Sequence, residues 1–373
     1  MQKEERNTLV KNLAKYNLAL LVLNLVLTPQ FMSGQTLAGT LDSSFGRGGK
    51  LTGVAGGAIA IQQDGKIVTA GGSKDDFSVA RLNPNGTLDA TFGSGGKVTT
   101  DFWGPYDGAS SVAIRADGKI IAAGTIVNSS SIADFALARY NPNGTLDTTF
   151  GTGGKVTTDF GGVSANAYSI AIQADGKIVL AGDAYIDPDF DIALARYNPN
   201  GTLDATFGKG GKVTTNLSAN DRASSLGILA DGKIVIAGQV VGKAFDFALL
   251  RYNRNGTLDT TFGTGGKVLT DFADLTGMAL SSEAANSLAI RFDGKIVAAG
   301  RTFVTTGYNW ALARYNSNGT LDTSFGKGGK VTTDFAGDSD EAGAVAVQTD
   351  GKTVVSGYAT INNAIVSALA RYQ

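Results

Sequence analysis

The side chains that could do chemistry in this chain are almost all carboxylates. The sequence has no Cys and no His, which removes thiolate nucleophiles, disulfides, imidazole bases and zinc sites built from nitrogen and sulfur. There are 33 acidic and 32 basic side chains, for a net charge of −1. Nucleic acids and anionic membranes need a basic footprint, so we predict neither as a partner.

The stretch IDPDFD is the main candidate for a metal site. Asp187, Asp189 and Asp191 alternate in it, and oxygen ligands at alternating positions suit a hard cation such as calcium. The stretch lacks the glycine at the sixth position and the distal Glu of a calcium-binding loop. An Asp also stands at the place of Asp191 in three other parts of the chain. We therefore predict no metal and no cofactor, and keep calcium as the alternative.

Three landmarks recur six times and define a repeat. They are G-T-L-D-x-x-F-G-x-G-G-K, a D-G-K triplet, and an Arg that ends an apolar run such as FALARYN. Successive repeats start 47 to 63 residues apart, a period typical of solenoids, propellers and other arrays. The repeats start near Gly39, Gly86, Gly144, Gly201, Gly256 and Gly319.

The recurring Arg lies eight residues before the Asp of each GTLD that follows it. Six arginines could form an anion-binding ring, but a constant spacing in every repeat favours a repeated ion pair or packing element of the frame. The glycines of FGxGGK resemble a phosphate-binding loop only superficially, because no helix follows them.

Each repeat is predicted to form four short strands. In the third repeat these are KVTTDF, YSIAIQ, KIVLAG and DIALARY, which are rich in β-branched and aromatic residues and are bounded by Gly, Asn and Asp. D-G-K predicts a tight hairpin turn and N-P-N-G a second turn. Six such units predict an all-β, six-bladed β-propeller. A β-solenoid, the main alternative, usually repeats every 20–30 residues or so.

These motifs also carry a family resemblance. The alternation of LDxxFGxGGKVTTDF, a run ending in DGKI, and FALARYNPNG resembles the delta-60 repeat family of bacterial proteins, over residues 39–373. The resemblance implies a β-propeller and no particular activity. VAIQADGKIVLAG is also similar, at the level of the fold, to the inner hairpin of NHL-type and lactonase-type propellers.

That similarity assigns an order to the strands of each blade. The run before D-G-K becomes the innermost strand a, KIVLAG strand b, DIALARY strand c, and KVTTDF the outermost strand d. Residues 50–54 then form a lone strand d at the front of the chain. We expect this strand to join the last blade and close the ring, which would remove two exposed sheet edges.

Loop lengths separate two faces of the propeller. The connections a–b and c–d have constant lengths, whereas d–a and b–c vary between repeats. We call the face with d–a and b–c connections the variable face, and the opposite one the constant face. Variable loops carry function more often than the frame does, and exposed aromatics can stack on sugars or anchor a protein. The candidate ligand-binding residues on the variable face are Trp103, Tyr106, Tyr185, Phe303 and Tyr308.

The sequence favours a non-catalytic binding or scaffold module, monomeric, with a protein or a glycan as its partner. Lactonase-like propellers hold a metal in the channel with carboxylate and amide side chains, so the resemblance implies a metal-dependent hydrolase as the alternative. Asp221, Glu283 or Glu341, just before innermost strands, would then serve it. The residue pairs at the strand-a entrances are not acidic, so we predict no catalytic residue. A purely structural surface protein is the third possibility.

Residues 1–35 differ from the remainder, residues 36–373, which we predict to be one propeller domain. A segment with four basic residues and two Glu precedes the apolar run of residues 18–27. The run is too short for a membrane-spanning helix and fits the apolar region of a signal peptide. We therefore expect a secreted, cell-surface or periplasmic protein with no membrane contact once the leader is removed.

Overall fold

The computed structural model describes residues 42–373, except for 55, 74–75, 103, 105, 129, 163, 242–244, 278–281, 306, 336–338 and 363. The predicted leader therefore lies outside the described residues. No helix within the described part of the chain is long and apolar enough to span a membrane. The described chain divides into two compact units, the first ending at Asp159 and the second beginning at Phe160. Each unit is described by itself.

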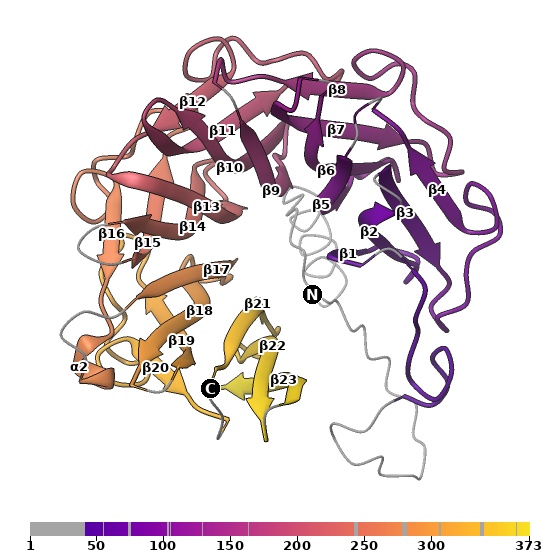
Figure 1. Cartoon of the computed structure of the whole chain (residues 1–373). Helices are drawn as coiled ribbons and strands as arrows, with labels where there is room; N and C mark the ends of the chain where they lie inside the picture. Colours follow the sequence, from indigo (N-terminus) through magenta and orange to yellow (C-terminus); the bar gives the residue numbers. More distant parts are fainter. Residues whose placement is uncertain are drawn as a thin grey trace, which may run out of the picture. The chain divides into compact units, whose positions relative to one another are not determined.

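The first unit holds two antiparallel sheets of four strands, each strand paired with the next in sequence (Figure 1). The first sheet consists of β1 (Ala58–Ile61), β2 (Ile67–Ser73), β3 (Asp76–Leu82) and β4 (Lys97–Thr100). The second consists of β5 (Tyr106–Ile114), β6 (Ile120–Val127), β7 (Ala133–Tyr140) and β8 (Lys155–Thr158).

The second unit holds three sheets of four strands and one of three (Figure 1). They comprise β9 (Ala165–Ile172), β10 (Ile178–Ile186), β11 (Asp189–Tyr197) and β12 (Lys212–Thr215); then β13 (Ala219–Ile228), β14 (Ile234–Val241), β15 (Phe245–Tyr252) and β16 (Lys267–Thr270); then β17 (Glu283–Ile290), β18 (Ile296–Val304), β19 (Gly307–Tyr315) and β20 (Lys330–Thr333); and last β21 (Glu341–Val347), β22 (Thr353–Ile361) and β23 (Ala364–Tyr372). One short helix, α2 (Ala273–Thr276), lies between β16 and β17. The predicted all-β, six-bladed propeller is confirmed.

Closure of the ring is not seen among the described residues. Residues 50–54 contain no strand, and the last described sheet has three strands. Ring closure by the N-terminal segment therefore stays a prediction. The described end of the first GTLDxxFG copy, residues 42–46, nevertheless contacts its unit as later copies do, because the Gly46 amide donates to the Asn85 carbonyl at 2.7 Å just as Gly208 donates to Asn255 at 2.8 Å.

Turn chemistry explains why the strands pair as they do. In the D-G-K turn between β9 and β10, the Asp175 carboxylate accepts from the Lys177 amide at 3.1 Å. Gly176 between them has a φ of 82°, a left-handed conformation that glycine adopts without steric cost. The turn fixes the hairpin register, so that Ile172 faces Ile178.

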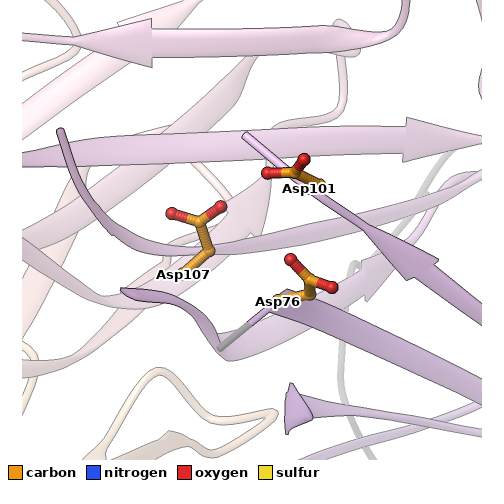
Figure 2. A group of neighbouring side chains, drawn as sticks. All are labelled: Asp76, Asp101 and Asp107. Atoms are coloured by element: carbon orange, nitrogen blue, oxygen red, sulfur yellow. The ribbon is translucent and has the colours of Figure 1, made fainter. Parts of the chain in front are cut away.

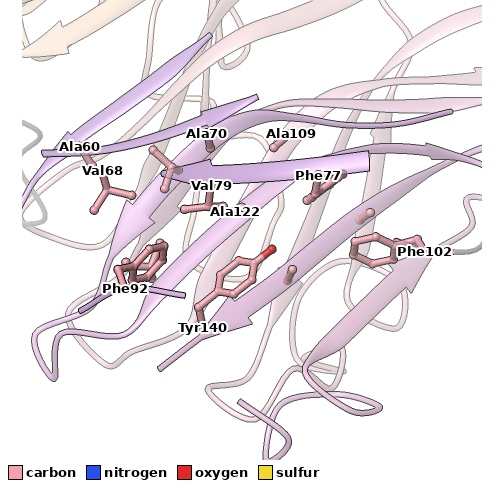
Figure 3. Close-up of a cluster of buried hydrophobic side chains, with 14 of the residues drawn as sticks. Ala60, Val68, Ala70, Phe77, Val79, Phe92, Phe102, Ala109, Ala122 and Tyr140 are labelled. Carbon is pink, nitrogen blue, oxygen red and sulfur yellow. The ribbon is translucent and has the colours of Figure 1, made fainter. Parts of the chain in front are cut away.

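The apolar core lies between neighbouring sheets. In the first unit, alanines, valines and aromatics of β1–β7 form one buried cluster, which includes Phe77, Phe92 and Tyr140 (Figure 3). Each Phe of GTLDxxFG in the four middle copies is fully buried. Trp310 occupies the Phe position of FALARY and is fully buried, as expected from the sequence.

The recurring Arg forms an ion pair with the Asp of GTLD, as predicted. In five copies the Arg Nε lies 2.7–2.8 Å from the Asp Oδ2, and both side chains are largely buried. The Lys of D-G-K reaches the same oxygen at 2.7–3.1 Å, and the guanidinium lies 4.4–4.8 Å from a Phe ring centroid. These charges belong to the frame. The aspartates are Asp89, Asp147, Asp204, Asp259 and Asp322.

We expect acid to unfold the protein because of these five carboxylates. Hydrogen bonds from Lys and from Thr or Ser, aided by the Arg charge, outweigh burial and hold their pKa values far below the usual range. A carboxylate whose pKa is lower in the folded state stabilises the fold at pH values above its unfolded-state pKa of about 4. This stabilisation is lost progressively as the pH falls below that value toward the folded-state pKa. The free energy of unfolding in urea should therefore drop steeply between pH 4 and pH 2. An unchanged urea midpoint over that range would contradict the prediction.

Candidate functional site

A β-bulge recurs in the innermost strands. In β5, β9, β13, β17 and β21 the register with the next strand shifts by one residue at the same place. Bulges re-aim a side chain and are frequent beside binding sites. The inserted residues differ from blade to blade and are Ser110, Tyr168, Ser224, Asn286 and Gly343.

The residue after the bulge belongs to the frame. Ser169 Oγ accepts a hydrogen bond from the Leu226 amide at 3.1 Å, and Ser225 Oγ accepts from the Leu288 amide at 3.2 Å. Each of these bonds joins the innermost strands of two neighbouring blades. The bulge therefore pairs a repeated structural Ser with a variable residue that is free to differ.

One polar cluster surrounds the bulge residue Tyr168. Its hydroxyl donates to Asp183 Oδ2 at 3.1 Å, and Asn166 Nδ2 donates to Asp183 Oδ1 at 2.9 Å. The Arg222 guanidinium carbon lies 3.8 Å from the Tyr168 ring centroid, and Arg222 Nε lies 3.8 Å from Asp183 Oδ2. The cluster thus joins an acid, a base, a phenol and an amide from two blades.

A second cluster of the same composition surrounds Glu341. Arg301 Nη1 lies 2.6 Å from Glu341 Oε2, and the Tyr358 hydroxyl donates to the same oxygen at 2.9 Å. Asn286, the bulge residue of β17, donates from Nδ2 to Glu341 Oε1 at 2.8 Å. The Arg301 guanidinium carbon lies 4.6 Å from the Tyr308 ring centroid. This cluster is partly open to solvent, because Tyr358 is 36% exposed.

Electrostatics keep the phenols of both clusters protonated. Burial raises the pKa of Tyr168, and the neighbouring Asp183 raises it further. Burial also raises the pKa of Tyr358, as does its hydrogen bond to Glu341. Burial raises the pKa of Asp183, against hydrogen bonds and the Arg222 charge that lower it. The clusters therefore present hydrogen-bond donors and acceptors in fixed positions.

The structure brings together two of the five aromatic residues predicted for the variable face. Phe303 and Tyr308 face each other across the β18–β19 hairpin, with ring centroids 5.4 Å apart. Tyr185 makes the equivalent pair with Phe190 on the β10–β11 hairpin, also at 5.4 Å. Tyr106 begins β5 and is 63% exposed. Trp103 lies outside the described residues.

Sequence reasoning missed the polar partners of these aromatics. Asp183, Arg301 and Tyr358 all follow directly on the glycine in strand b. The residue after this glycine differs in every blade, whereas the glycine itself is the same in all six. A variable position next to an invariant one could have identified these residues as candidates from the sequence.

The three acids of the hydrolase alternative do not form one site. Asp221 is fully buried and accepts from the backbone amides of Leu217 and Ser218 at 2.6 and 2.9 Å. Glu283 is also buried, and its Oε1 accepts from the Phe272 amide at 3.1 Å. Only Glu341 belongs to a cluster that is partly open to solvent.

The described residues do contain a group of carboxylates that could hold a metal, but it is not IDPDFD. Asp76, Asp101 and Asp107 each place a carboxylate oxygen within 4.8 Å of the others (Figure 2). Asp191 of IDPDFD is buried, whereas Asp187 is exposed at the end of its hairpin. The IDPDFD carboxylates do not form such a group, because Asp187 lies in the turn between β10 and β11, whereas Asp189 and Asp191 are spread along β11.

Six sheets of antiparallel strands, each strand paired with the next in sequence, define a β-propeller. The family described as "Domain of unknown function (DUF5122) beta-propeller" matches residues 62–92, 115–150, 173–207, 229–262, 293–325 and 348–373. The chain belongs to this family. The match supports the predicted propeller-repeat family, while the delta-60 name remains a resemblance.

One solved structure supports the fold. A protein from Lactobacillus plantarum is 15% identical, with a TM-score of 0.51 over 84% of this chain and 83% of that one. A gluconolactonase from Xanthomonas campestris is 11% identical, with a TM-score of 0.43 over 85% of this chain and 86% of that one. The polysaccharide lyase Uly1 is 12% identical, with a TM-score of 0.46 over 92% and 85%. No curated protein sequence matches the chain.

Proposed function

We propose that the chain is an exported, non-catalytic binding module whose ligand is a glycan. The Glu341 cluster carries the proposal. Its carboxylate, guanidinium, amide and phenol groups bind one another in fixed orientations, beside the Phe303–Tyr308 pair. Such groups match sugar hydroxyls, and an arrangement already ordered in the free protein lowers the cost of binding. An apolar patch, as a protein partner would favour, is not what these residues form.

We expect binding to a panel of immobilised neutral and uronic-acid oligosaccharides. Arg301→Ala and Tyr308→Ala should each weaken it at least about tenfold, because each removes a side chain of the proposed contact surface. Surface plasmon resonance of the full chain measures the change.

Phe292→Ala is the matched control. Phe292 is 79% exposed and precedes a D-G-K turn on the constant face, so its loss should leave binding unchanged. If no oligosaccharide on the panel binds, the glycan proposal fails and the purely structural interpretation remains. Binding that Phe292→Ala reduces and Tyr308→Ala does not would place the ligand on the other face.

A further inference from the structure

We propose that Asp76, Asp101 and Asp107 bind one calcium ion. The three residues come from different elements that meet at the variable face. Asp76 is the first residue of β3, Asp101 follows β4, and Asp107 is the second residue of β5 in the neighbouring blade. One carboxylate oxygen of each lies within 4.8 Å of the corresponding oxygens of the other two, and Figure 2 shows the three carboxylates grouped together. A bound cation would therefore connect two blades.

The Asp107 carboxylate is the observation that points to a ligand. The residue is only 3% exposed. One of its oxygens, Oδ2, accepts from the Phe102 amide at 2.7 Å, whereas Oδ1 is buried and has no hydrogen-bond partner among the described residues. A buried carboxylate oxygen without a partner is costly, and a cation would satisfy it.

The β4–β5 connection passes close to that oxygen at Gly104. A Cβ on Gly104 would lie 2.9 Å from Asp107 Oδ1 and 2.1 Å from the Val127 carbonyl oxygen. Only a glycine at position 104 lets the backbone approach Oδ1 this closely.

Among the described residues, Lys155 is the cation whose charge acts on Asp107. Lys155 Nζ donates a hydrogen bond to the Asp101 main-chain carbonyl oxygen at 2.9 Å. Within the described part of the chain, three carboxylates and this lysine leave an acidic site that favours a divalent cation.

Calcium fits the spacing. Calcium–oxygen distances are about 2.3–2.6 Å, so oxygens up to about 4.8 Å apart can contact one ion at once. Three carboxylates supply part of the six to eight oxygens that calcium takes, and the exposed side of Asp101 leaves room for water ligands. Magnesium binds at about 2.0–2.1 Å in a strict octahedron, which this spacing suits less well.

Isothermal titration of the chelator-treated full chain with calcium chloride tests the site. We expect one saturable calcium per chain, at least about tenfold weaker magnesium binding, and a higher melting temperature in calcium. Asp107→Asn should weaken calcium binding at least about tenfold. Asp101→Asn should weaken it too, and because Asp101 is exposed that variant keeps the test valid if Asp107→Asn fails to fold.

Asp187→Asn is the control, because it removes the same charge from the exposed IDPDFD hairpin. It should bind calcium like the parent. The proposal is overturned if titration of the parent with calcium shows no heat of binding. It is also overturned if Asp101→Asn binds calcium as tightly as the parent, or if magnesium binds as well as calcium. Loss of binding in Asp187→Asn alone would place the ion at IDPDFD instead.

Discussion

Replacing Asp204 with Asn is expected to lower the free energy of unfolding by about 3–5 kcal/mol. Asp204 Oδ2 lies 2.7 Å from Arg196 Nε and 2.8 Å from Lys177 Nζ. Its Oδ1 accepts from the amide and hydroxyl of Thr206 at 3.1 and 2.7 Å. Asn keeps an acceptor for Thr206 but leaves the guanidinium of Arg196, itself 5% exposed, without its countercharge in a poorly solvated place.

Urea unfolding followed by circular dichroism measures this loss. Asp175→Asn is the control, since it removes the same charge from an exposed hairpin turn and should cost no more than about 0.5 kcal/mol. Equal losses in the two variants would show that the buried pair contributes nothing beyond net charge, contrary to its position in the frame.

The frame could be predicted from the sequence because its parts are local. The Arg and the Asp of each ion pair are eight residues apart, on either side of one turn, so their constant spacing reflects a contact within one blade. The hairpin turns are equally local, because Asp-Gly supplies its own left-handed residue. Repetition made these signals stronger, because the Arg–Asp spacing occurs five times and the D-G-K turn six times.

The candidate site could be predicted only in part. Phe303 and Tyr308 are close in sequence and pair across one tight hairpin, whereas their role in binding stays a prediction. Arg301 and Glu341 are forty residues apart in different blades, and no pattern in the sequence connects them. Asp76 and Asp107 meet for the same kind of reason, through the packing of β3 against β5.

The bulge was beyond pattern reasoning. A period of two identifies a strand and its buried face, but one inserted residue changes which side chain points where. From the sequence, Ser224-Ser225 and Asn286-Ser287 are two of the residue pairs at the strand-a entrances. In the structure, the first member of each is the inserted residue, and the second joins neighbouring blades.

Gly300→Ala is expected to destabilise the second unit by about 3 kcal/mol and to abolish binding at the Glu341 cluster. Gly300 faces the bulge of β17, and a Cβ there would lie 1.8 Å from the Ala284 carbonyl oxygen. Backbone cannot yield that far without losing the register. Asn286 is the inserted residue and Arg301 follows Gly300, so both would be displaced from Glu341. Urea unfolding and the oligosaccharide assay measure the two effects.

Gly343→Ala is the matched control for this substitution. Gly343 is the inserted residue of the bulge in β21, and the nearest atom to a Cβ there is the Ser356 carbonyl oxygen at 3.8 Å, an ordinary contact. The change should alter stability by no more than about 0.5 kcal/mol. If Gly300→Ala were as mild, the strands would tolerate a methyl group at the bulge. The recurrence of glycine at that position of strand b would then need a cause other than the close approach of the backbone.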